Sequence, residues 1–142
     1  MLAALPPGNY IGIDIDRERI DEAKKTLPNA LFYVMDVSYG IPDGVERETV
    51  IVADVLEHLP FDKAMKVLLR AWELAGTNMI ITLPWDDDLA INIDHKWRPN
   101  EAYASKICCA IEGQGNTGSV TSERKFGFCL MDFPRLKVSK AT

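Results

Sequence analysis

Apolar residues occur in short runs that alternate with segments in which they recur every three or four positions. The runs are typical of strands buried on both faces, and the spaced pattern is typical of helices that bury one face. The predicted strands cover residues 10–14, 30–35, 49–53 and 78–83. Because helical segments separate most of these strands, the pattern indicates a parallel sheet with helices on both faces.

Residues that favour helix starts mark where the predicted helices begin. Asp16 and Asp62 stand where an aspartate side chain caps a helix, and Pro99 stands where proline opens one. These helices should reach about residues 27, 75 and 111. After a glycine-rich turn, residues 119–121 and 126–131 are predicted to form an antiparallel hairpin. The expected fold class is therefore α/β, with a mostly parallel sheet and a C-terminal hairpin.

The composition changes this picture little but disfavours several kinds of protein. A chain of 142 residues is too short for two ordinary domains, so we expect one domain over residues 1–142. No stretch approaches the roughly 18 apolar residues of a membrane span, and the net charge of −5 does not favour nucleic acid. Three cysteines without a zinc spacing suggest reduced thiols. We therefore expect a cytoplasmic protein with no membrane partner.

An aspartate follows each of the first three predicted strands, at Asp14, Asp36 and Asp54. Ligands of parallel sheets bind at the carboxyl ends of the strands, so three carboxylates there favour a binding site. Asp14 is suited to accept hydrogen bonds from the two hydroxyls of a ribose, as in an adenosine-containing cofactor. Asp36 is placed to accept from an adenine amino group, with the Val37 backbone at a ring nitrogen. Taken singly, each aspartate is also explained as a helix cap or loop residue.

Three motifs resemble those of a known family. They are GIDID at residues 12–16, VMDV at residues 34–37 and VADVLEHLP at residues 52–60. In order and spacing they are similar to successive motifs of class I S-adenosylmethionine-dependent methyltransferases, and the resemblance extends from about residue 8 to residue 133. It implies a Rossmann-like fold, S-adenosylmethionine as the cofactor and transfer of its methyl group.

The resemblance also implies roles for five residues. Asp14 would bind the ribose, Ile15 would pack on the adenosine, Asp36 and Val37 would contact the adenine, and Asp54 would border the methionine moiety.

The family opens with a strand and a glycine-rich loop that this chain lacks before residues 10–14. The domain is thus expected to be N-terminally incomplete, and the chain is either a fragment or must close the sheet otherwise. We expect the sheet to close by pairing residues 10–14 directly with residues 49–53, or to be completed by a second copy in a homodimer. Cofactor affinity should be weak in either case.

The two histidines, His58 and His95, follow the third and fourth predicted strands, where a methyltransferase active site would lie. A histidine there can act as a general base on a hydroxyl or amine acceptor. The other explanation is that His58 packs at the start of the next helix. His58 and His95 are thus the candidate catalytic residues, and the favoured mechanism assigns no metal ligand.

Asp54, Glu57, His58 and His95 together offer another possibility, because carboxylates and imidazoles can hold a divalent cation that activates a ribose hydroxyl. This set resembles the metal site of the small-RNA terminal 2′-O-methyltransferases, whose motifs include a Glu-His pair and a later Asp-His-Lys segment, here residues 94–96. That family has a glutamate at the position of Asp54.

Aromatic side chains accompany these candidates. Trp85, Trp97 and Phe61 could line a pocket for a planar or cationic acceptor. Tyr103 falls on a predicted helix and is better explained as a core residue.

Three functions stay open on the sequence. The favoured one is a methyltransferase enzyme with an unidentified acceptor. The alternatives are a non-catalytic methyltransferase-like binding module and a metal-dependent RNA 2′-O-methyltransferase. Another kind of nucleotide binder is disfavoured because a glycine loop that would hold phosphates is missing.

Overall fold

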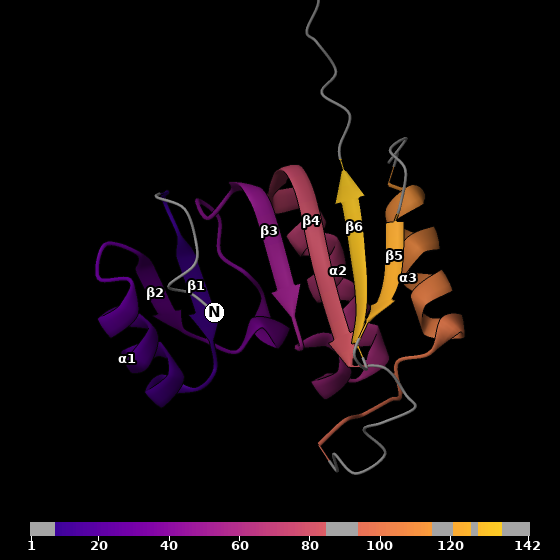
Figure 1. Cartoon of the computed structure of the whole chain (residues 1–142), viewed down its shortest axis with the longest axis horizontal. Coiled ribbons are helices and arrows are strands. Elements are labelled where there is room, and N and C mark those ends of the chain that lie inside the picture. The colour runs from indigo at the N-terminus through magenta and orange to yellow at the C-terminus, as the bar shows by residue number, and fades with distance from the viewer. Residues whose placement is uncertain (1–7, 85–93, 115–120, 126–127, 135–142) are drawn as a thin grey trace, which may run out of the picture. The chain divides into compact units, whose positions relative to one another are not determined.

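The computed structural model describes residues 8–84, 94–114, 121–125 and 128–134 (Figure 1). The helices and strands are, in chain order, β1 (Ile11–Asp14), α1 (Arg17–Thr26), β2 (Leu31–Val34), β3 (Arg47–Ala53), α2 (Phe61–Leu74), β4 (Ala75–Pro84), α3 (Glu101–Glu112), β5 (Thr121–Lys125) and β6 (Phe128–Pro134), with short 3₁₀ helices η2 (Val37–Tyr39) and η3 (Leu56–His58). They form two compact units, Met1–Val45 and Glu46–Thr142, and each is described by itself. The expectation of one domain stays a prediction.

The first unit is a strand–helix–strand arrangement. β1 and β2 pair in parallel, with Ile11 opposite Leu31 and Asp14 opposite Val34. α1 connects the two strands and buries Ile20. Gly12 allows the Phe32 ring to lie across β1, because a Cβ at Gly12 would come 2.5 Å from that ring. The glycine of the GIDID motif therefore has a packing role between these strands.

The second unit holds a four-stranded sheet in the order β3-β4-β6-β5. β3 and β4 are parallel, whereas β6 pairs antiparallel with both β4 and β5. α2 packs against β3 and β4 and contacts α3, and Figure 1 shows it behind these strands. The parallel pair and the closing hairpin confirm the mixed α/β fold that the sequence predicts.

The core of the second unit lies on one face of this sheet. Met79, Ile81 and Leu83 alternate along β4 and are fully buried. On β6, Phe133 pairs with Met79 and Met131 pairs with Ile81, so apolar side chains continue across the strands. The helices contribute the buried residues Ala64, Val67, Leu68, Ala71 and Trp72 from α2, and Ile107 and Ile111 from α3.

Two of the three predicted helix starts are wrong in detail. The Asp16 side chain caps α1 as expected, by accepting from the backbone N–H groups of Glu18 and Arg19. Asp62 instead lies inside the first turn of α2, where an acidic side chain favours the positive end of the helix dipole. Asn100, rather than Pro99, caps α3, because its side chain accepts from two backbone N–H groups of the first turn.

β1 hydrogen-bonds with β2, and β3 hydrogen-bonds with β4, in separate sheets. These two strand pairs belong to different units, so the expected direct pairing of residues 10–14 with residues 49–53 stays a prediction. Completion of the sheet by a second copy stays a prediction. Of the helices in the described ranges, none is long and apolar enough to cross a membrane.

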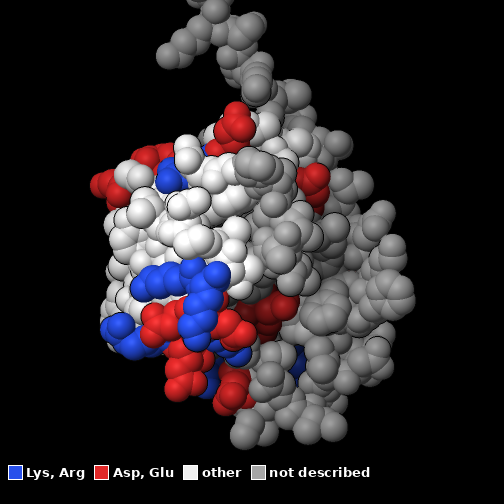
Figure 2. Space-filling view, turned by 60° about the vertical axis from the view of Figure 1, so that its left-hand side comes forward, with Lys and Arg blue, Asp and Glu red and all other residues white. Residues whose placement is uncertain are grey.

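The surface of α1 mixes charges of both signs. Arg19 pairs with Asp16 at 3.6 Å, and Lys24 pairs with Asp21 at 3.7 Å. Figure 2 shows basic and acidic side chains next to one another in the lower part of the face that it draws. Neighbouring charges of opposite sign cancel one another over a few ångströms.

Candidate active site

In the first unit, Asp14 and Asp36 lie at the same edge of the β1–β2 pair, because Asp14 is the last residue of β1 and Asp36 closely follows β2, which runs parallel to it. The Asp14 carboxylate accepts a hydrogen bond from the Asp16 backbone N–H at 2.8 Å. The Asp36 carboxylate accepts one from the Ser38 backbone N–H, also at 2.8 Å, and thereby caps η2. Both residues therefore stabilise the turns after their strands, and these bonds also fix the directions of the two carboxylates.

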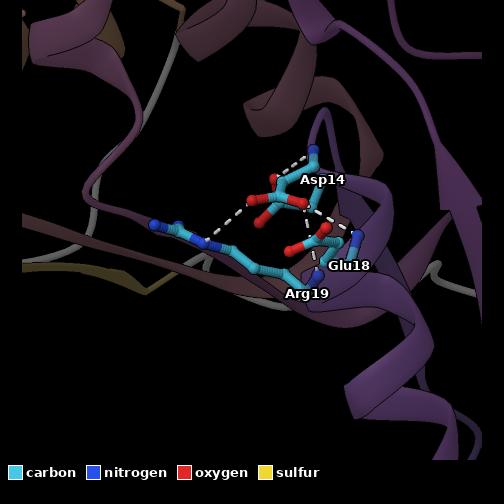
Figure 3. A network of polar contacts seen from close by, with 4 residues as sticks. Asp14, Glu18 and Arg19 are labelled. Atoms are coloured by element: carbon cyan, nitrogen blue, oxygen red, sulfur yellow. Dashed lines mark hydrogen bonds and ion pairs between the residues drawn. The ribbon is translucent and has the colours of Figure 1, made fainter.

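Figure 3 shows the polar network between Asp14 and the start of α1. Asp16 donates its N–H to Asp14, and its own carboxylate accepts from the backbone of Glu18 at 2.8 Å and of Arg19 at 3.4 Å. The residue between them, Ile15, is 67% exposed. An apolar side chain that stays in water next to an oriented carboxylate is suited to cover a flat ligand. Val37, after Asp36, is half-buried.

In the second unit, Asp54 follows β3 with a φ of 50°. It is the one residue other than glycine with a positive φ in the part of the chain that the structure describes. Aspartate tolerates this left-handed conformation better than most residues. Two hydrogen bonds to β4 hold it: its N–H donates to the Thr82 carbonyl at 3.2 Å, and the Thr82 hydroxyl donates to its carboxylate at 3.0 Å.

Glu57, in η3, is 0% exposed, and neither of its carboxylate oxygens has a hydrogen-bond partner among the described residues. The pKa of Glu57 is raised to about 7, mainly by burial; the residue's own backbone N–H lowers it by less, and the negative charge of Asp54 adds a smaller increase. A buried carboxylate without a partner is costly when it is charged. It is therefore protonated, or compensated by a positive charge, either on the His58 imidazole 4.0 Å away or on a cation that enters the site.

His58 and His95 lie against one another, with ring centroids 4.9 Å apart and ring planes at 75°. The His58 Nε2 is 4.0 Å from a carboxylate oxygen of Glu57. Burial lowers the pKa of His95, and the neighbouring His58 lowers it further, although Asp94 and Asp54 act in the opposite direction. The lowered pKa favours the neutral form of His95, which can accept a proton or bind a metal.

Glu57, His58 and His95 each offer one ligand atom, and these atoms all lie within 4.8 Å of one another. Ligand atoms on opposite sides of an ion at about 2.1 Å are about 4.2 Å apart, so small side-chain movements would close this set around a cation. One carboxylate with two imidazoles suits a transition metal such as Mn²⁺ or Zn²⁺. The structure thus brings both predicted histidines together with Glu57.

The segment that carries His95 is attached to η3. The Lys96 backbone N–H donates to the Glu57 carbonyl at 2.7 Å, and the Trp97 indole N–H donates to the Leu59 carbonyl at 3.1 Å. Trp97 is 7% exposed, and its ring contacts those of Phe61 and Tyr103. Trp97 is therefore a packed residue and does not line an open pocket, contrary to expectation.

The predicted site residues divide between the units. Asp14, Ile15, Asp36 and Val37 belong to the first, whereas Asp54, His58 and His95 belong to the second. A common site for the two sets stays a prediction, and Trp85 lies outside the described residues. The sequence pattern missed Thr82, which is one of several polar residues on predicted strands and carries no distinguishing signal.

Comparisons with known proteins identify the fold. No protein-family model and no curated protein sequence matches the chain. Solved structures do match it. The small RNA methyltransferase HEN1 aligns with a TM-score of 0.73 and 17% identity, over 93% of this chain and 21% of that protein. An O-methyltransferase family protein from Burkholderia thailandensis aligns with a TM-score of 0.67 and 16% identity, over 89% of this chain and 43% of that protein.

A third match is magnesium protoporphyrin IX methyltransferase from Synechocystis PCC 6803 with bound SAH, at a TM-score of 0.62 and 16% identity, over 91% of this chain and 75% of that protein. The chain thus spans less than half the length of the first two structures. At these identities the likeness shows the fold, which is the Rossmann-like fold of class I S-adenosylmethionine-dependent methyltransferases.

Proposed function

We propose that the chain is an S-adenosylmethionine-dependent methyltransferase domain. The observation that carries this proposal is the pair of oriented carboxylates, Asp14 and Asp36, at one edge of two parallel strands. The fold supports it, because matching methyltransferases were solved with bound SAH or SAM. S-adenosylmethionine supplies a methyl group on a positively charged sulfur, from which the group is readily displaced.

In this proposal the first unit holds the adenosine. Asp14 accepts hydrogen bonds from the ribose hydroxyls, and Asp36 and the Val37 backbone contact the adenine. The exposed Ile15 side chain covers the adenine face and loses its contact with water on binding. Asp54, fixed by Thr82, borders the methionine moiety.

The second unit handles the acceptor. His95, neutral because its pKa is lowered, takes the proton of the acceptor hydroxyl while the oxygen attacks the methyl carbon. Bound S-adenosylmethionine would supply the methyl group to this oxygen, and its sulfur would keep the electron pair of the broken sulfur–carbon bond, so His95 would have to hold only the acceptor proton. The remaining contribution of the protein is to hold the two reactants in line.

Calorimetry with S-adenosylmethionine and S-adenosylhomocysteine tests the cofactor. We expect weak but measurable binding by the intact chain. Asp14→Asn should weaken it roughly 10- to 100-fold, because a charged hydrogen-bond acceptor contributes about 1.5–3 kcal/mol. Asp21→Asn is the matched control, since Asp21 lies on α1 and pairs with Lys24. Absence of binding by the unmodified chain would instead favour the non-catalytic module.

A second candidate is metal-dependent methyl transfer to the 2′-hydroxyl of a terminal RNA ribose. The specific observation is the convergence of His58 and His95 on the buried carboxylate of Glu57, which has no hydrogen-bond partner among the described residues. The fold likeness to a small RNA methyltransferase adds support. Held by these three side chains, Mg²⁺ or Mn²⁺ would neutralise Glu57 and lower the pKa of a coordinated hydroxyl.

Methyl transfer to short RNAs tests this candidate. An RNA with a terminal 2′-hydroxyl should accept a methyl group in the presence of Mn²⁺, and the same RNA with a terminal 2′-deoxyribose should not. Glu57→Gln should abolish the Mn²⁺-dependent transfer, whereas Glu73→Gln, which alters an exposed ion pair with Arg70, should retain it. Transfer that proceeds unchanged in excess chelator would exclude the metal.

A further inference from the structure

Two hydrogen bonds attach the segment that follows His95 to the protein. One reaches Glu57 in η3, and the other reaches Leu59, the residue after η3. The first is the 2.7 Å bond from the Lys96 N–H to the Glu57 carbonyl, and the second is the 3.1 Å bond from the Trp97 indole to the Leu59 carbonyl. A single bond would leave the segment able to rotate about it. Two bonds at successive residues fix both the position and the direction of the backbone that carries His95.

Trp97 is itself held from two helices. Its ring centroid is 5.5 Å from that of Phe61, at the start of α2, and 4.6 Å from that of Tyr103, in α3. The Lys106 ammonium lies over the Phe61 and Tyr103 rings at 5.4 and 5.1 Å. The indole is therefore a rigid support, and its N–H direction is set by packing that lies outside the cluster of Glu57, His58 and His95.

We infer that Trp97 is a positioning residue that presents His95 to Glu57 and His58, so that the three ligand atoms are brought together before any cation binds. The inference rests on the proposed use of this cluster, and it deepens that proposal by assigning the residue that builds the site. Trp97 touches no reacting atom and acts through the backbone of the segment at His95.

The experiment compares three forms of the full chain by NMR. Trp97→Phe removes the indole N–H and retains an aromatic ring. Replacing Trp97 with benzothienylalanine removes only the N–H, since sulfur takes the place of nitrogen in a ring of almost unchanged shape. Trp72→Phe is the matched control, because Trp72 is also buried in the second unit. The readout is the nuclear Overhauser effect between the ring protons of His58 and His95, which are in contact in the structure.

We expect this signal to be lost in both Trp97 variants and retained in Trp72→Phe. Co²⁺ affinity, followed by its visible absorption, should fall about 10- to 100-fold in the Trp97 variants, as is typical when a support of a metal ligand is removed. Retention of the histidine signal in the Trp97 variants, or its equal loss in Trp72→Phe, overturns the inference. If the unmodified chain binds no Co²⁺, the metal-dependent function fails separately, and the histidine signal alone decides the role of Trp97.

Discussion

The hydroxyl of Thr82 donates a hydrogen bond to the carboxylate of Asp54 at 3.0 Å, while the Asp54 N–H donates to the carbonyl of the same threonine at 3.2 Å. One residue of β4 thus fixes both the backbone and the side chain of an aspartate that has a positive φ. This pair joins the end of β3 to its neighbour at the edge where the candidate acceptor site lies.

Thr82→Val should remove the side-chain bond without changing the shape of β4. We expect the free energy of unfolding to fall by about 1 kcal/mol, the usual net contribution of a hydrogen bond. Urea denaturation measures this change. Thr77→Val is the control, because Thr77 is also half-buried in β4. If the free energy of unfolding falls equally in Thr82→Val and Thr77→Val, the loss comes from replacing a threonine in β4 and not from the bond to Asp54.

Glu57 should make the protein less stable as the pH rises. Its pKa in the folded state is about 7, above the ordinary 4.5, so the folded state retains a proton that the unfolded state has lost. The resulting stabilisation is fully present below pH 4.5 and is lost as the pH rises to about 7. Its size is on the order of 3 kcal/mol, from about 1.4 kcal/mol per pKa unit.

Urea denaturation at several pH values measures the effect of Glu57. Glu57→Gln should flatten the decrease in stability between pH 4.5 and 7, whereas Glu73→Gln should leave it in place. Mn²⁺ should restore stability to the unmodified chain above pH 7 by neutralising the carboxylate. If the free energy of unfolding falls equally with pH in the unmodified chain and in Glu57→Gln, Glu57 is not the cause of the decrease.

His95 should titrate below the ordinary histidine value of 6.5, because burial and the neighbouring His58 both lower its pKa. His58→Ala removes the second cause, so the pKa of His95 should rise in that variant. NMR titration of the imidazole protons measures both values. If His95 titrates identically with and without His58, the electrostatic coupling inferred from their contact is wrong.

Gly12→Ala should destabilise the first unit selectively. The added Cβ would come 2.5 Å from the Phe32 ring, so this ring must leave its position across β1 or the two strands must move apart. Such overpacking typically costs about 1–3 kcal/mol. Hydrogen exchange should show faster exchange of the amides in β1 and β2 than in β4. Gly76→Ala is the comparison, since a Cβ there would come 3.4 Å from the nearest atom, an ordinary contact. If the amides of β1 and β2 exchange equally slowly in Gly12→Ala and in Gly76→Ala, Gly12 does not have the packing role assigned to it.

The sequence predicts the strands well because each is a short apolar run, and Asp14, Asp36 and Asp54 follow them as expected. Helix starts were less predictable, since Asp62 and Asn100 are both good capping types and only the local backbone decides which one caps.

The contacts that build the acceptor site could not be predicted from spacing. Thr82 and Asp54 are 28 residues apart, and Trp97 and Leu59 are 38 residues apart. Sequence periodicity describes neighbours within one helix or strand, whereas these bonds depend on how separate elements pack. The convergence of His58 and His95 was accessible only through the resemblance to a known family, which placed both after successive strands.

The position of β6 between β4 and β5 has a consequence for synthesis on the ribosome. The contacts of the first unit lie within the first 45 residues, so they become available early. β4 ends at Pro84, but its antiparallel partner begins only at Phe128. At about 5–20 residues per second, that interval lasts roughly 2–9 s. During this time one edge of an apolar nascent strand exposes unpaired N–H and C=O groups, which makes it a target for chaperones and for strands of neighbouring nascent chains.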